Sequence, residues 1–327
     1  MASFAHFLRS QWLFTPPYPK QSFEGQTVII TGSNTGLGRE AARHIVRLGA
    51  EKVIIACRSA EKGEAARANI EKSTGRTNVI EVWQLDLGSY DSVKEFAKRA
   101  EGLPRIDVLL ENAGIAKNYW SMIADNESCV TVNVISTMLL GILLLPKLKQ
   151  VATKYKIRPI LSIVNSEVHG YTQLPERKAP GKLFDNLNDE KLSAPYVKER
   201  YPVSKLLQVF ATRALVDEYA SPADQFPVTI NLVNPGLCYS ELSREQGPMF
   251  RFMQIVLGAR STEVGSRTLV WGAAGGPETH GKYMSDCKVA EFGRFVTTEE
   301  GVKTQQRTWE ELKEKLKKIE PGLFDRL

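Results

Sequence analysis

The sequence predicts one α/β domain of the Rossmann type, built on a doubly wound parallel sheet. Short runs rich in Val, Ile and Leu recur along the 327 residues, and segments with helical spacing separate them. The runs are apolar almost without interruption, which is typical of strands that helices cover on both faces. A regular alternation of such strands with helices indicates a parallel sheet.

Six apolar runs are expected to be strands, and the segments between several of them are expected to be helices that end near a glycine. The expected strands are 26–30, 52–56, 78–85, 106–110, 159–164 and 228–233, and the expected helices lie within 37–51, 59–75 and 89–102. No repeat or low-complexity linker divides the chain. We therefore expect a single Rossmann domain over 25–290, with an N-terminal extension at 1–24, a flap at 172–195 and a C-terminal helical tail at 291–327.

The composition excludes several classes of protein. The hydrophobic share of 43% and the charged share of 24% are those of an ordinary globular protein. The net charge is +6, but Lys and Arg are mixed with Asp and Glu along the chain and form no nucleic-acid-binding module, so no nucleic-acid partner is expected. The four cysteines are widely spaced, which predicts no metal site and a reducing compartment, the cytoplasm.

Two apolar segments raise the question of a membrane. Residues 136–148 are too few to span a bilayer, so a buried helix is expected there and no transmembrane segment. Residues 4–14 place Phe4, Leu8 and Trp12 on one side of a short helix. This N-terminal arm is expected to dock on the protein's own body or on a partner chain, with contact to a membrane surface as the alternative.

A glycine-rich loop, TGSNTGLG at 31–38, follows the first expected strand and opens the first expected helix. Gly32, Gly36 and Gly38 allow the backbone to turn sharply and to approach a pyrophosphate. The helix N-terminus offers free N–H groups and the positive end of its dipole to that anion. Because a strand precedes the loop and a helix follows it, the loop indicates dinucleotide binding and not only a tight turn.

The turn after the second strand distinguishes the two nicotinamide dinucleotides. A carboxylate there would bind the adenosine ribose of NAD, whereas an arginine favours the 2′-phosphate of NADP. Arg58 occupies this turn, and Arg39 follows the last glycine of the loop. Two guanidinium groups near one dianion favour NADP(H) as the cofactor, and the alternative is that both are solvated surface residues.

Further motifs follow the glycine-rich loop and span most of residues 25–290. They are Asp86 in WQLDLGS, ENAG at 111–114, Asn133 in TVNVIS, Ser166 in IVNSEVH, YPVSK at 201–205 and NPG at 234–236. Together, in this order, they resemble the short-chain dehydrogenase/reductase superfamily. Within that superfamily the chain resembles the retinol-dehydrogenase-like branch and the fungal reductases of secondary metabolism.

The resemblance assigns a role to each motif. It implies that Ser166, Tyr201 and Lys205 are catalytic, and that Asn133 supports a water-mediated proton relay through Lys205. It assigns no role to His169, which we expect to be structural. It implies cofactor contacts for Gly32, Gly36, Leu37, Gly38, Arg39, Arg58, Asp86, Asn112, Gly114, Tyr201, Lys205, Leu237 and Ser240.

The chemistry of the Tyr201–Lys205 pair suits proton transfer. Four positions apart on a helix, the two side chains share one face. A free phenol has a pKa of about 10, and an ammonium group about 4 Å away would lower it by roughly one to three units. Tyr201 is therefore expected to exchange a proton with the substrate oxygen, and Ser166 to stabilise the charge on that oxygen. Pro202 requires that the helix begins close to Tyr201 or that it kinks.

These residues predict an NADP(H)-dependent oxidoreductase that interconverts a carbonyl and an alcohol on a medium-sized apolar substrate. By resemblance, the substrate is polyketide-, terpenoid- or retinoid-like. The Met- and Phe-rich segment 241–261 is expected to close over it as a lid, with a core helix as the alternative. Two other functions stay open: a nucleotide-sugar epimerase or dehydratase, and a non-catalytic sensor or scaffold that binds NADP. The resemblance also allows a homo-oligomer.

Overall fold

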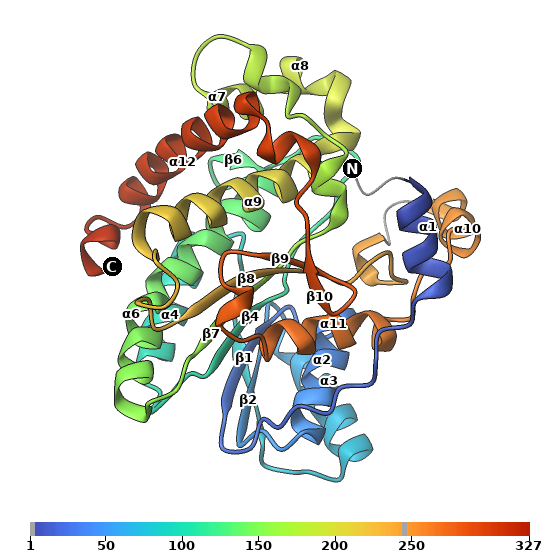
Figure 1. The fold of residues 1–327 in the computed structure, drawn as a ribbon, viewed down its shortest axis with the longest axis vertical. Coiled ribbons are helices and arrows are strands. Elements are labelled where there is room, and N and C mark those ends of the chain that lie inside the picture. Colours follow the sequence, from blue (N-terminus) through green and yellow to red (C-terminus); the bar gives the residue numbers. More distant parts are fainter. Residues whose placement is uncertain (1–3, 244–246) are drawn as a thin grey trace.

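An eight-stranded sheet with the strand order β10-β9-β8-β7-β4-β1-β2-β3 forms the centre of the protein (Figure 1). The computed structural model describes residues 4–243 and 247–327. Neighbouring strands run parallel, except that β10 is antiparallel to β9. The strands are β1 (Thr27–Thr31), β2 (Lys52–Cys57), β3 (Ile80–Gln84), β4 (Val108–Glu111), β7 (Ile160–Val164), β8 (Thr229–Asn234), β9 (Tyr283–Ser285) and β10 (Lys288–Ala290). The predicted Rossmann-type sheet is confirmed.

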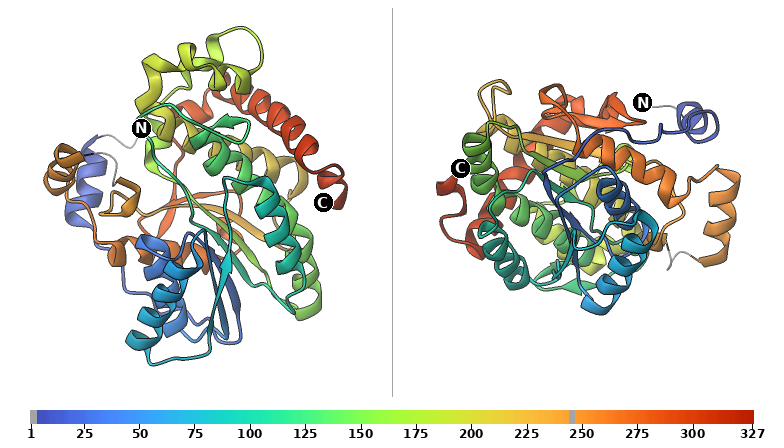
Figure 2. Two further views of the ribbon diagram at one scale, coloured as in Figure 1. Left: turned by 180° about the vertical axis from the view of Figure 1, so that it is seen from behind. Right: turned by 90° about the horizontal axis from the view of Figure 1, so that it is seen from below.

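Helices cover both faces of this sheet (Figures 1 and 2). One layer consists of α2 (Gly36–Arg47), α3 (Ala60–Thr74) and α11 (Thr262–Ala273). The other consists of α4 (Tyr90–Glu101), α6 (Thr137–Tyr155) and α9 (Arg200–Tyr219). The long helix α12 (Glu299–Ile319) packs against α9. The three helices that the sequence predicted correspond to α2, α3 and α4.

The strands are buried on both faces, which explains their continuous apolar sequence. In β1, Ile29 joins the core beside α4, α6 and α9, whereas Val28 and Ile30 join the core beside α2, α3 and α11. In β2, Ile54 and Ile55 divide between the two cores in the same way. All of these side chains are fully buried. The alternation of polar and apolar residues that marks a half-exposed strand is absent because neither face meets water.

The most apolar segment of the chain lies in the helical stretch that leads into α6. Its first turns are α5 (Ser128–Val130) and the π-helical η1 (Thr131–Ser136). Within the described ranges, one helical stretch, Ser128–Tyr155, is long and apolar enough to cross a membrane, but its most apolar window is entirely buried inside the protein. The buried core helix that the sequence predicted is confirmed.

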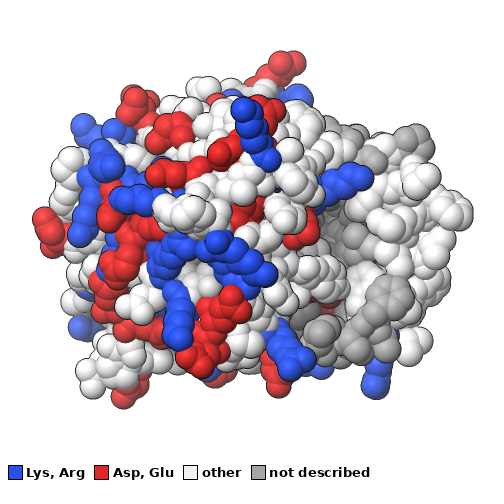
Figure 3. All heavy atoms as spheres, turned by 90° about the horizontal axis from the view of Figure 1, so that it is seen from above, with Lys and Arg blue, Asp and Glu red and all other residues white. Residues whose placement is uncertain are grey.

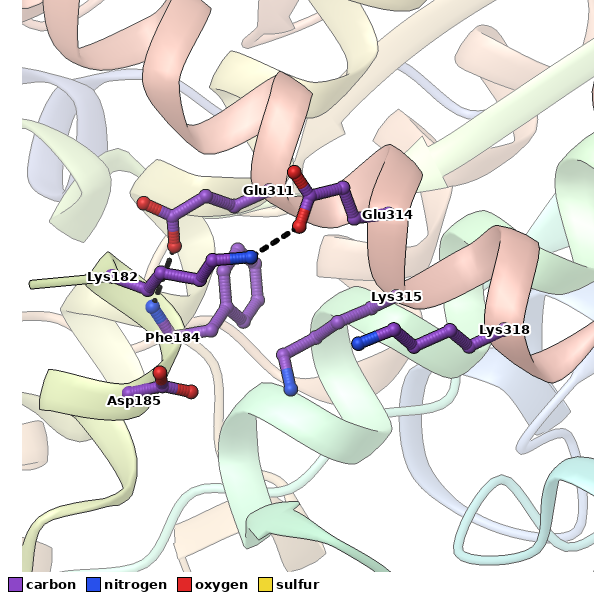
Figure 4. A pocket seen from close by; sticks show the side chains of 7 residues that line it. All are labelled: Lys182, Phe184, Asp185, Glu311, Glu314, Lys315 and Lys318. Carbon is purple, nitrogen blue, oxygen red and sulfur yellow. Dashed lines mark hydrogen bonds and ion pairs between the residues drawn. The ribbon is translucent and has the colours of Figure 1, made fainter.

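The insertion at 172–195 is folded and is held against the C-terminal helix. It contains η3 (Pro175–Lys178), α7 (Leu183–Asn188) and α8 (Glu190–Ser193), and η4 (Ala194–Glu199) follows it. The Glu311 carboxylate in α12 accepts hydrogen bonds from the backbone N–H groups of Leu183 at 2.9 Å and Phe184 at 3.0 Å. Figure 4 shows the Phe184–Glu311 contact beside the Lys182–Glu314 ion pair, around a small crevice of about 50 Å³ between α7 and α12.

A buried ion pair between Glu176 and Arg200 fastens the insertion to the first residue of α9. Both side chains are inaccessible to solvent. Two charges removed from water must stay paired, because removing one partner leaves the other uncompensated. Arg200 directly precedes Tyr201, so this pair fixes the point at which α9 begins.

Two further helices, α1 (Phe4–Leu13) and α10 (Gly247–Val256), lie at the same end of the molecule, away from α12 (Figures 1 and 2). The predicted N-terminal extension at 1–24 includes residues 1–3, and the predicted lid at 241–261 includes residues 244–246. Both short stretches lie outside the described residues.

A carboxyl group without a partner lies inside the core at the end of β4. Glu111 is 3% exposed, and neither of its oxygens has a hydrogen-bond partner among the described residues. It faces α6, where a Cβ atom on Gly141 would lie 3.5 Å from Oε1 of Glu111. Burial raises the pKa of Glu111 well above 4.5. The folded protein therefore holds this side chain as a neutral acid.

Replacing Glu111 with Gln should change how stability depends on pH. The stability that comes from the neutral acid is complete below the pKa of the unfolded chain, about 4.5, and is lost as the pH rises towards the raised pKa of the folded state. In thermal unfolding, the Tm of Glu111→Gln should therefore rise relative to the Tm of the parent as the pH increases. We expect this difference in Tm to grow by at least about 1 °C between pH 5 and pH 8. Glu101→Gln, at an exposed position in α4, is the control and should show no such trend. A difference for Glu111→Gln that is constant with pH would contradict the assignment.

Candidate active site

The residues that the sequence singled out gather at the carboxyl edge of the sheet. The glycine-rich loop follows β1, Asn112 follows β4, Ser166 follows β7 and Leu237 lies in the loop after β8. In open parallel sheets, ligands bind at this edge, where the strand order reverses. Here the order reverses between β1 and β4, so these loops surround one position.

Ser166 and Tyr201 are brought into direct contact. Ser166 is the N-cap of η2 (Glu167–Gly170), where its hydroxyl accepts a hydrogen bond from the N–H of Val168 at 3.4 Å. Tyr201 is the second residue of α9, and its hydroxyl lies close enough to the Ser166 side chain for a hydrogen bond from Ser166 to lower the pKa of the phenol. Pro202 therefore lies in the first turn of the helix, where its missing N–H costs no hydrogen bond. The helix begins beside Tyr201, which was one of the two arrangements that the sequence allowed.

Lys205 is held by acceptors that are part of the protein. Its ammonium group donates to the carbonyl of Val164 at 2.8 Å and to Oε1 of Gln208 at 3.0 Å. The side chain is 4% exposed, and burial lowers the pKa of Lys205 to about 7. The ammonium nitrogen lies 5.6 Å from the centre of the Tyr201 ring. Because burial disfavours the charge, the two acceptors are what keep a protonated lysine at this place.

The pKa of Tyr201 differs from the sequence-based prediction. The sequence predicted that Lys205 lowers it, but burial raises the pKa of Tyr201, and only the hydrogen bond from Ser166 acts against that rise. The prediction was wrong because the ammonium group points to Val164 and Gln208. It also took no account of the loss of hydration that the phenol undergoes in the folded protein. At neutral pH, Tyr201 is therefore a protonated phenol.

Asn133 lies in the π-helical turn η1 and is fixed by its amide. Oδ1 accepts from the N–H of Ile115 at 2.9 Å, and Nδ2 donates to the carbonyl of Ile115 at 2.8 Å and to Oγ of Ser204 at 2.9 Å. A π-helical turn often marks a functional site, because it releases backbone groups from the regular helical ladder.

Gln208 connects Asn133 to Lys205 through side-chain hydrogen bonds. Its Nε2 donates to the carbonyl of Asn133, and its Oε1 accepts from Nζ of Lys205 and, at 3.2 Å, from Nδ2 of Asn165. The sequence analysis did not single out Gln208. Its position three residues after Lys205, on the same face of α9, is the signal that could have found it.

His169 holds the Ser166 segment against the C-terminal tail. Its Nε2 accepts from the N–H of Gly293 at 2.8 Å, so Nδ1 carries the proton and donates to the carbonyl of Ser166 at 2.7 Å. Burial lowers the pKa of His169, which favours this neutral form. Its ring packs edge-on against Tyr283, with 4.8 Å between the ring centres. These contacts support the structural role that the sequence predicted.

Glu167, beside Ser166, is a second residue that the sequence analysis missed. Burial raises the pKa of its carboxyl group to about 7, the negative charge of Asp286 adds to the rise, and Arg260 opposes it. A carboxylate directly after the motif serine was the available signal, but its charge state depends on Asp286 and Arg260, which lie far along the chain.

The glycine-rich loop has the shape of a phosphate cradle. Gly32 has a φ of +65°, and a Cβ atom there would lie 2.9 Å from the Cα of Ala113. On Gly38, a Cβ atom would lie 2.5 Å from Nδ2 of Asn112, so no side chain fits at that position. Gly36 has a φ of +57°, and its Cβ would meet no atom within 4 Å. The open space lies in front of the N-terminus of α2, which is the position that a pyrophosphate requires.

Neighbouring residues support the loop from behind. Nδ2 of Asn112 donates to the carbonyls of Thr31 at 2.9 Å and of Gly32 at 3.2 Å. Leu37 packs on α11, where a Cβ atom on Gly265 would lie 2.9 Å from its Cδ2. Asn112 therefore fixes the loop to β4, and Leu37 fixes it to α11.

Two more of the predicted cofactor residues stabilise local turns. A Cβ atom on Gly114 would lie 3.1 Å from Oδ1 of Asn133, so a side chain there would press on the Asn133 amide. Asp86 is half-buried, and its Oδ1 accepts from the N–H of Gly88 at 2.8 Å. This bond fixes the turn after β3.

A polar cavity of about 390 Å³ opens beside the loop. Arg39, which the resemblance implies as a cofactor contact, lines this cavity and also pairs with Glu40 at 3.3 Å. Arg58 is exposed at the end of β2 and is not among the lining residues. Lys62 in α3 does line the cavity, which the sequence analysis did not foresee. The lining residues are Asn34, Thr35, Arg39, Lys62, Ala65, Ala66, Asn69 and Glu241.

The N-terminal arm is bound to the loop after β8. The Gln11 amide, oriented to satisfy its partners, accepts from the N–H of Leu237 at 3.0 Å and donates to its carbonyl at 3.2 Å. Arg260, which is 6% exposed, donates to the carbonyl of Pro235 at 3.1 Å, to that of Ser10 at 3.0 Å and to the Asp286 carboxylate at 2.7 Å. The arm and Arg260 therefore fix the course of the loop. Ser240, further along it, is half-buried.

Comparison with known proteins agrees with this geometry. Residues 26–160 match the family model described as short chain dehydrogenase. The chain is 49% identical over 320 residues to the short chain dehydrogenase/reductase dmxR8 of Cryptosporiopsis sp. (strain 8999), a match that covers 97% of this chain and 98% of that protein. It is 43% identical to the short-chain dehydrogenase anuD of Penicillium roqueforti (strain FM164), over 97% of this chain and 84% of the other.

Solved structures share the fold. The NADP complex of Pseudomonas aeruginosa RhlG aligns with 82% of this chain and 97% of its own, at a TM-score of 0.60 and 20% identity. A short chain dehydrogenase from Shigella flexneri in complex with NADP aligns at a TM-score of 0.57 and 21% identity, over 83% of this chain and all of the other. With the curated relatives, the loop geometry and the Ser166–Tyr201 contact, these findings establish that the chain belongs to the short-chain dehydrogenase/reductase family of oxidoreductases.

Proposed function

We propose that this protein is an NADP(H)-dependent oxidoreductase that interconverts a carbonyl and an alcohol on a medium-sized apolar substrate. The observation that carries the proposal is the contact between Ser166 and Tyr201, with Lys205 one helical turn further on and the phosphate cradle at the same sheet edge. A hydroxyl, a phenol and an ammonium group gathered there suit reversible proton transfer to a substrate oxygen.

The described residues fit a nicotinamide dinucleotide. The open space before α2 would take its pyrophosphate, and the loop that Gln11 and Arg260 hold would face its nicotinamide end. When bound, the nicotinamide supplies or accepts the hydride. The protein contributes orientation and a place from which bulk water is excluded.

The protonation states favour the reductive direction. Because burial raises the pKa of Tyr201, its hydroxyl keeps its proton at neutral pH and can donate it to an alkoxide, which is a far stronger base. Ser166 would donate a hydrogen bond to the same substrate oxygen and stabilise the negative charge that develops there. Lys205 would position the ribose side of the cofactor and add positive charge in the range where it is protonated, below about pH 7.

The cavity beside the loop supports NADP(H) over NAD(H). Arg39 and Lys62 bring two positive charges to it, and the 2′-phosphate is the group that distinguishes the two cofactors. Its other lining residues include the amides of Asn34 and Asn69, which could complete the hydrogen bonds to that phosphate. Solved relatives whose titles name NADP, such as the P. aeruginosa RhlG complex, give independent support.

The substrate class follows from the surroundings of the site and from the family resemblance. Segment 241–261 follows the loop around Leu237 and is rich in Met and Phe, and the insertion at 172–195 ends six residues before Tyr201. A polyketide-, terpenoid- or retinoid-like carbonyl compound would match such apolar surroundings.

Turnover with a carbonyl compound tests the proposal. Purified protein should oxidise NADPH in the presence of at least one member of a panel of apolar ketones, aldehydes and quinones, followed at the absorbance of the reduced cofactor. Tyr201→Phe should reduce kcat by about 10² to 10⁴ and leave NADPH affinity, measured by fluorescence titration, within about threefold. Tyr196→Phe, five residues earlier in η4, is the matched control and should keep parental activity.

Two results would contradict this function. Tight NADPH binding without turnover of any carbonyl would support a cofactor-binding sensor instead. Full activity in Tyr201→Phe would show that the phenol does not donate the proton. A group in the Ser166 segment would then have to donate it.

Cofactor preference tests the role of the two cations. The double variant Arg39→Ser/Lys62→Ser should raise the KM for NADPH by at least about 100-fold, because each of the two charge-assisted hydrogen bonds contributes about 1.5–3 kcal/mol. The KM for NADH should change by less than about threefold, since NADH lacks the phosphate. Lys72→Ser, at an exposed position on α3, is the control. An equal loss for both cofactors would contradict 2′-phosphate recognition.

A further inference from the structure

Large apolar side chains are concentrated on the surface of the N-terminal arm and α10. Met249 is 84% exposed and Leu13 is 79% exposed, which leaves most of each side chain in water. Monomeric proteins rarely expose contiguous apolar surface of this kind without a binding partner. We call this the α1/α10 surface; its members are Trp12, Leu13, Phe14, Met249, Phe252, Met253, Ile255 and Val256.

The two helices form one surface because they are joined near their ends. A Cβ atom on Gly258, just after α10, would lie 3.1 Å from the Trp12 ring. The Gln11 amide also donates to the carbonyl of Gly258 at 3.2 Å. On the inner side of α10, Gln254 is 2% exposed and donates to the carbonyl of Cys238 at 3.1 Å. One face of α10 is therefore fixed to the protein, and the other carries the apolar side chains outwards.

The two segments that form this surface contain basic but no acidic residues, although Asp286 lies against the arm and is paired with Arg260 and Ser10. Residues 4–23 and 247–262 contain no Asp or Glu, although the whole chain has 37 acidic residues beside 43 basic ones. The basic residues of these two segments include Arg9, Lys20 and Arg251. Figure 3 shows charged side chains crowded on the side of α7, α8 and α12, and few among the described residues at the opposite end, where α1 and α10 lie.

The charge pattern disfavours a second copy of the chain as the occupant. A symmetric dimer formed through this surface would bring the same segments of both copies together, and positive charge would then face positive charge. A bilayer with anionic headgroups can bind both the exposed apolar side chains and the basic residues of these segments. Bulky apolar side chains enter the boundary between headgroups and acyl chains, while Lys and Arg remain beside the phosphates.

We propose that the α1/α10 surface docks this protein on the surface of an anionic phospholipid bilayer. Contact is peripheral, since α1 has 10 residues and α10 has 10, too few to span the hydrocarbon core. The same arm holds the loop around Leu237, so docking brings the bilayer to the side of the molecule that carries this loop.

Vesicle flotation tests the proposal directly. The full chain should float with vesicles that contain roughly one third phosphatidylserine in phosphatidylcholine. Binding should weaken by about tenfold or more with pure phosphatidylcholine or in about 0.5 M NaCl. The triple variant Met249→Gln/Phe252→Gln/Ile255→Gln should lose at least about a hundredfold in partitioning, because its three apolar anchors are gone.

A matched control separates this surface from general surface hydrophobicity. Val289→Gln/Val302→Gln removes side chains that are 45% and 49% exposed but lie outside the α1/α10 surface, and it should bind vesicles as the parent does. Far-UV circular dichroism and NADPH titration of the triple variant show whether it is folded. If that variant is misfolded, the single change Met249→Gln, at the most exposed of these side chains, is measured instead and should weaken binding by about tenfold.

The outcomes are distinct. Failure of the parent to float with anionic vesicles would overturn the proposal, and so would equal flotation of the folded triple variant. A parent that does not float but is a dimer in analytical ultracentrifugation, and that the triple substitution converts to a monomer, would assign the surface to a second copy of the chain.

Discussion

The candidate active site is organised around the buried ammonium group of Lys205. A buried charge is costly unless it forms hydrogen bonds within the protein. The ammonium group of Lys205 donates hydrogen bonds to the carbonyl of Val164 and to the side chain of Gln208. The first partner lies at the end of β7, so that hydrogen bond fixes α9 against the strand, whereas the second partner lies on α9 itself. Ser166 follows Val164 by two residues, and Tyr201 precedes Lys205 by one helical turn. The Ser166–Tyr201 contact is a geometric consequence of where the lysine is held.

The same burial determines what the phenol can do. In water, an adjacent ammonium group would lower the pKa of a tyrosine, but inside this protein the loss of hydration dominates and the pKa rises. Such a phenol keeps its proton at neutral pH, and it can still give that proton to an alkoxide because the alkoxide is a far stronger base. Under the proposed function, a protonated phenol would serve carbonyl reduction, and the direction in the cell would also depend on the supply of reduced cofactor.

The sheet and the motif residues could be identified from the sequence. Contacts between residues that lie far apart along the chain could not be predicted from it. The run 52–56 could be recognised as a strand, β2, because helices bury both of its faces. Burial on both faces produces a continuous apolar run, which is visible in the sequence. The strands β9 and β10 have three residues each, too few for any periodicity to emerge. Arg260 and Ser10 are 250 positions apart, so no local pattern could reveal that they meet. The pKa of Tyr201 was mispredicted for a related reason, because the sequence shows a neighbouring charge but not the depth of burial.

Hydride transfer to the substrate is the central claim, and isotope transfer measures it directly. NADPH that carries deuterium at the transferable position of the nicotinamide is incubated with the protein and a carbonyl compound that it turns over, and the alcohol is analysed by mass spectrometry. The account predicts one deuterium per product molecule on the former carbonyl carbon, with the hydroxyl proton coming from solvent by way of Tyr201. A product without deuterium, formed at the same rate as NADPH is consumed, would contradict it.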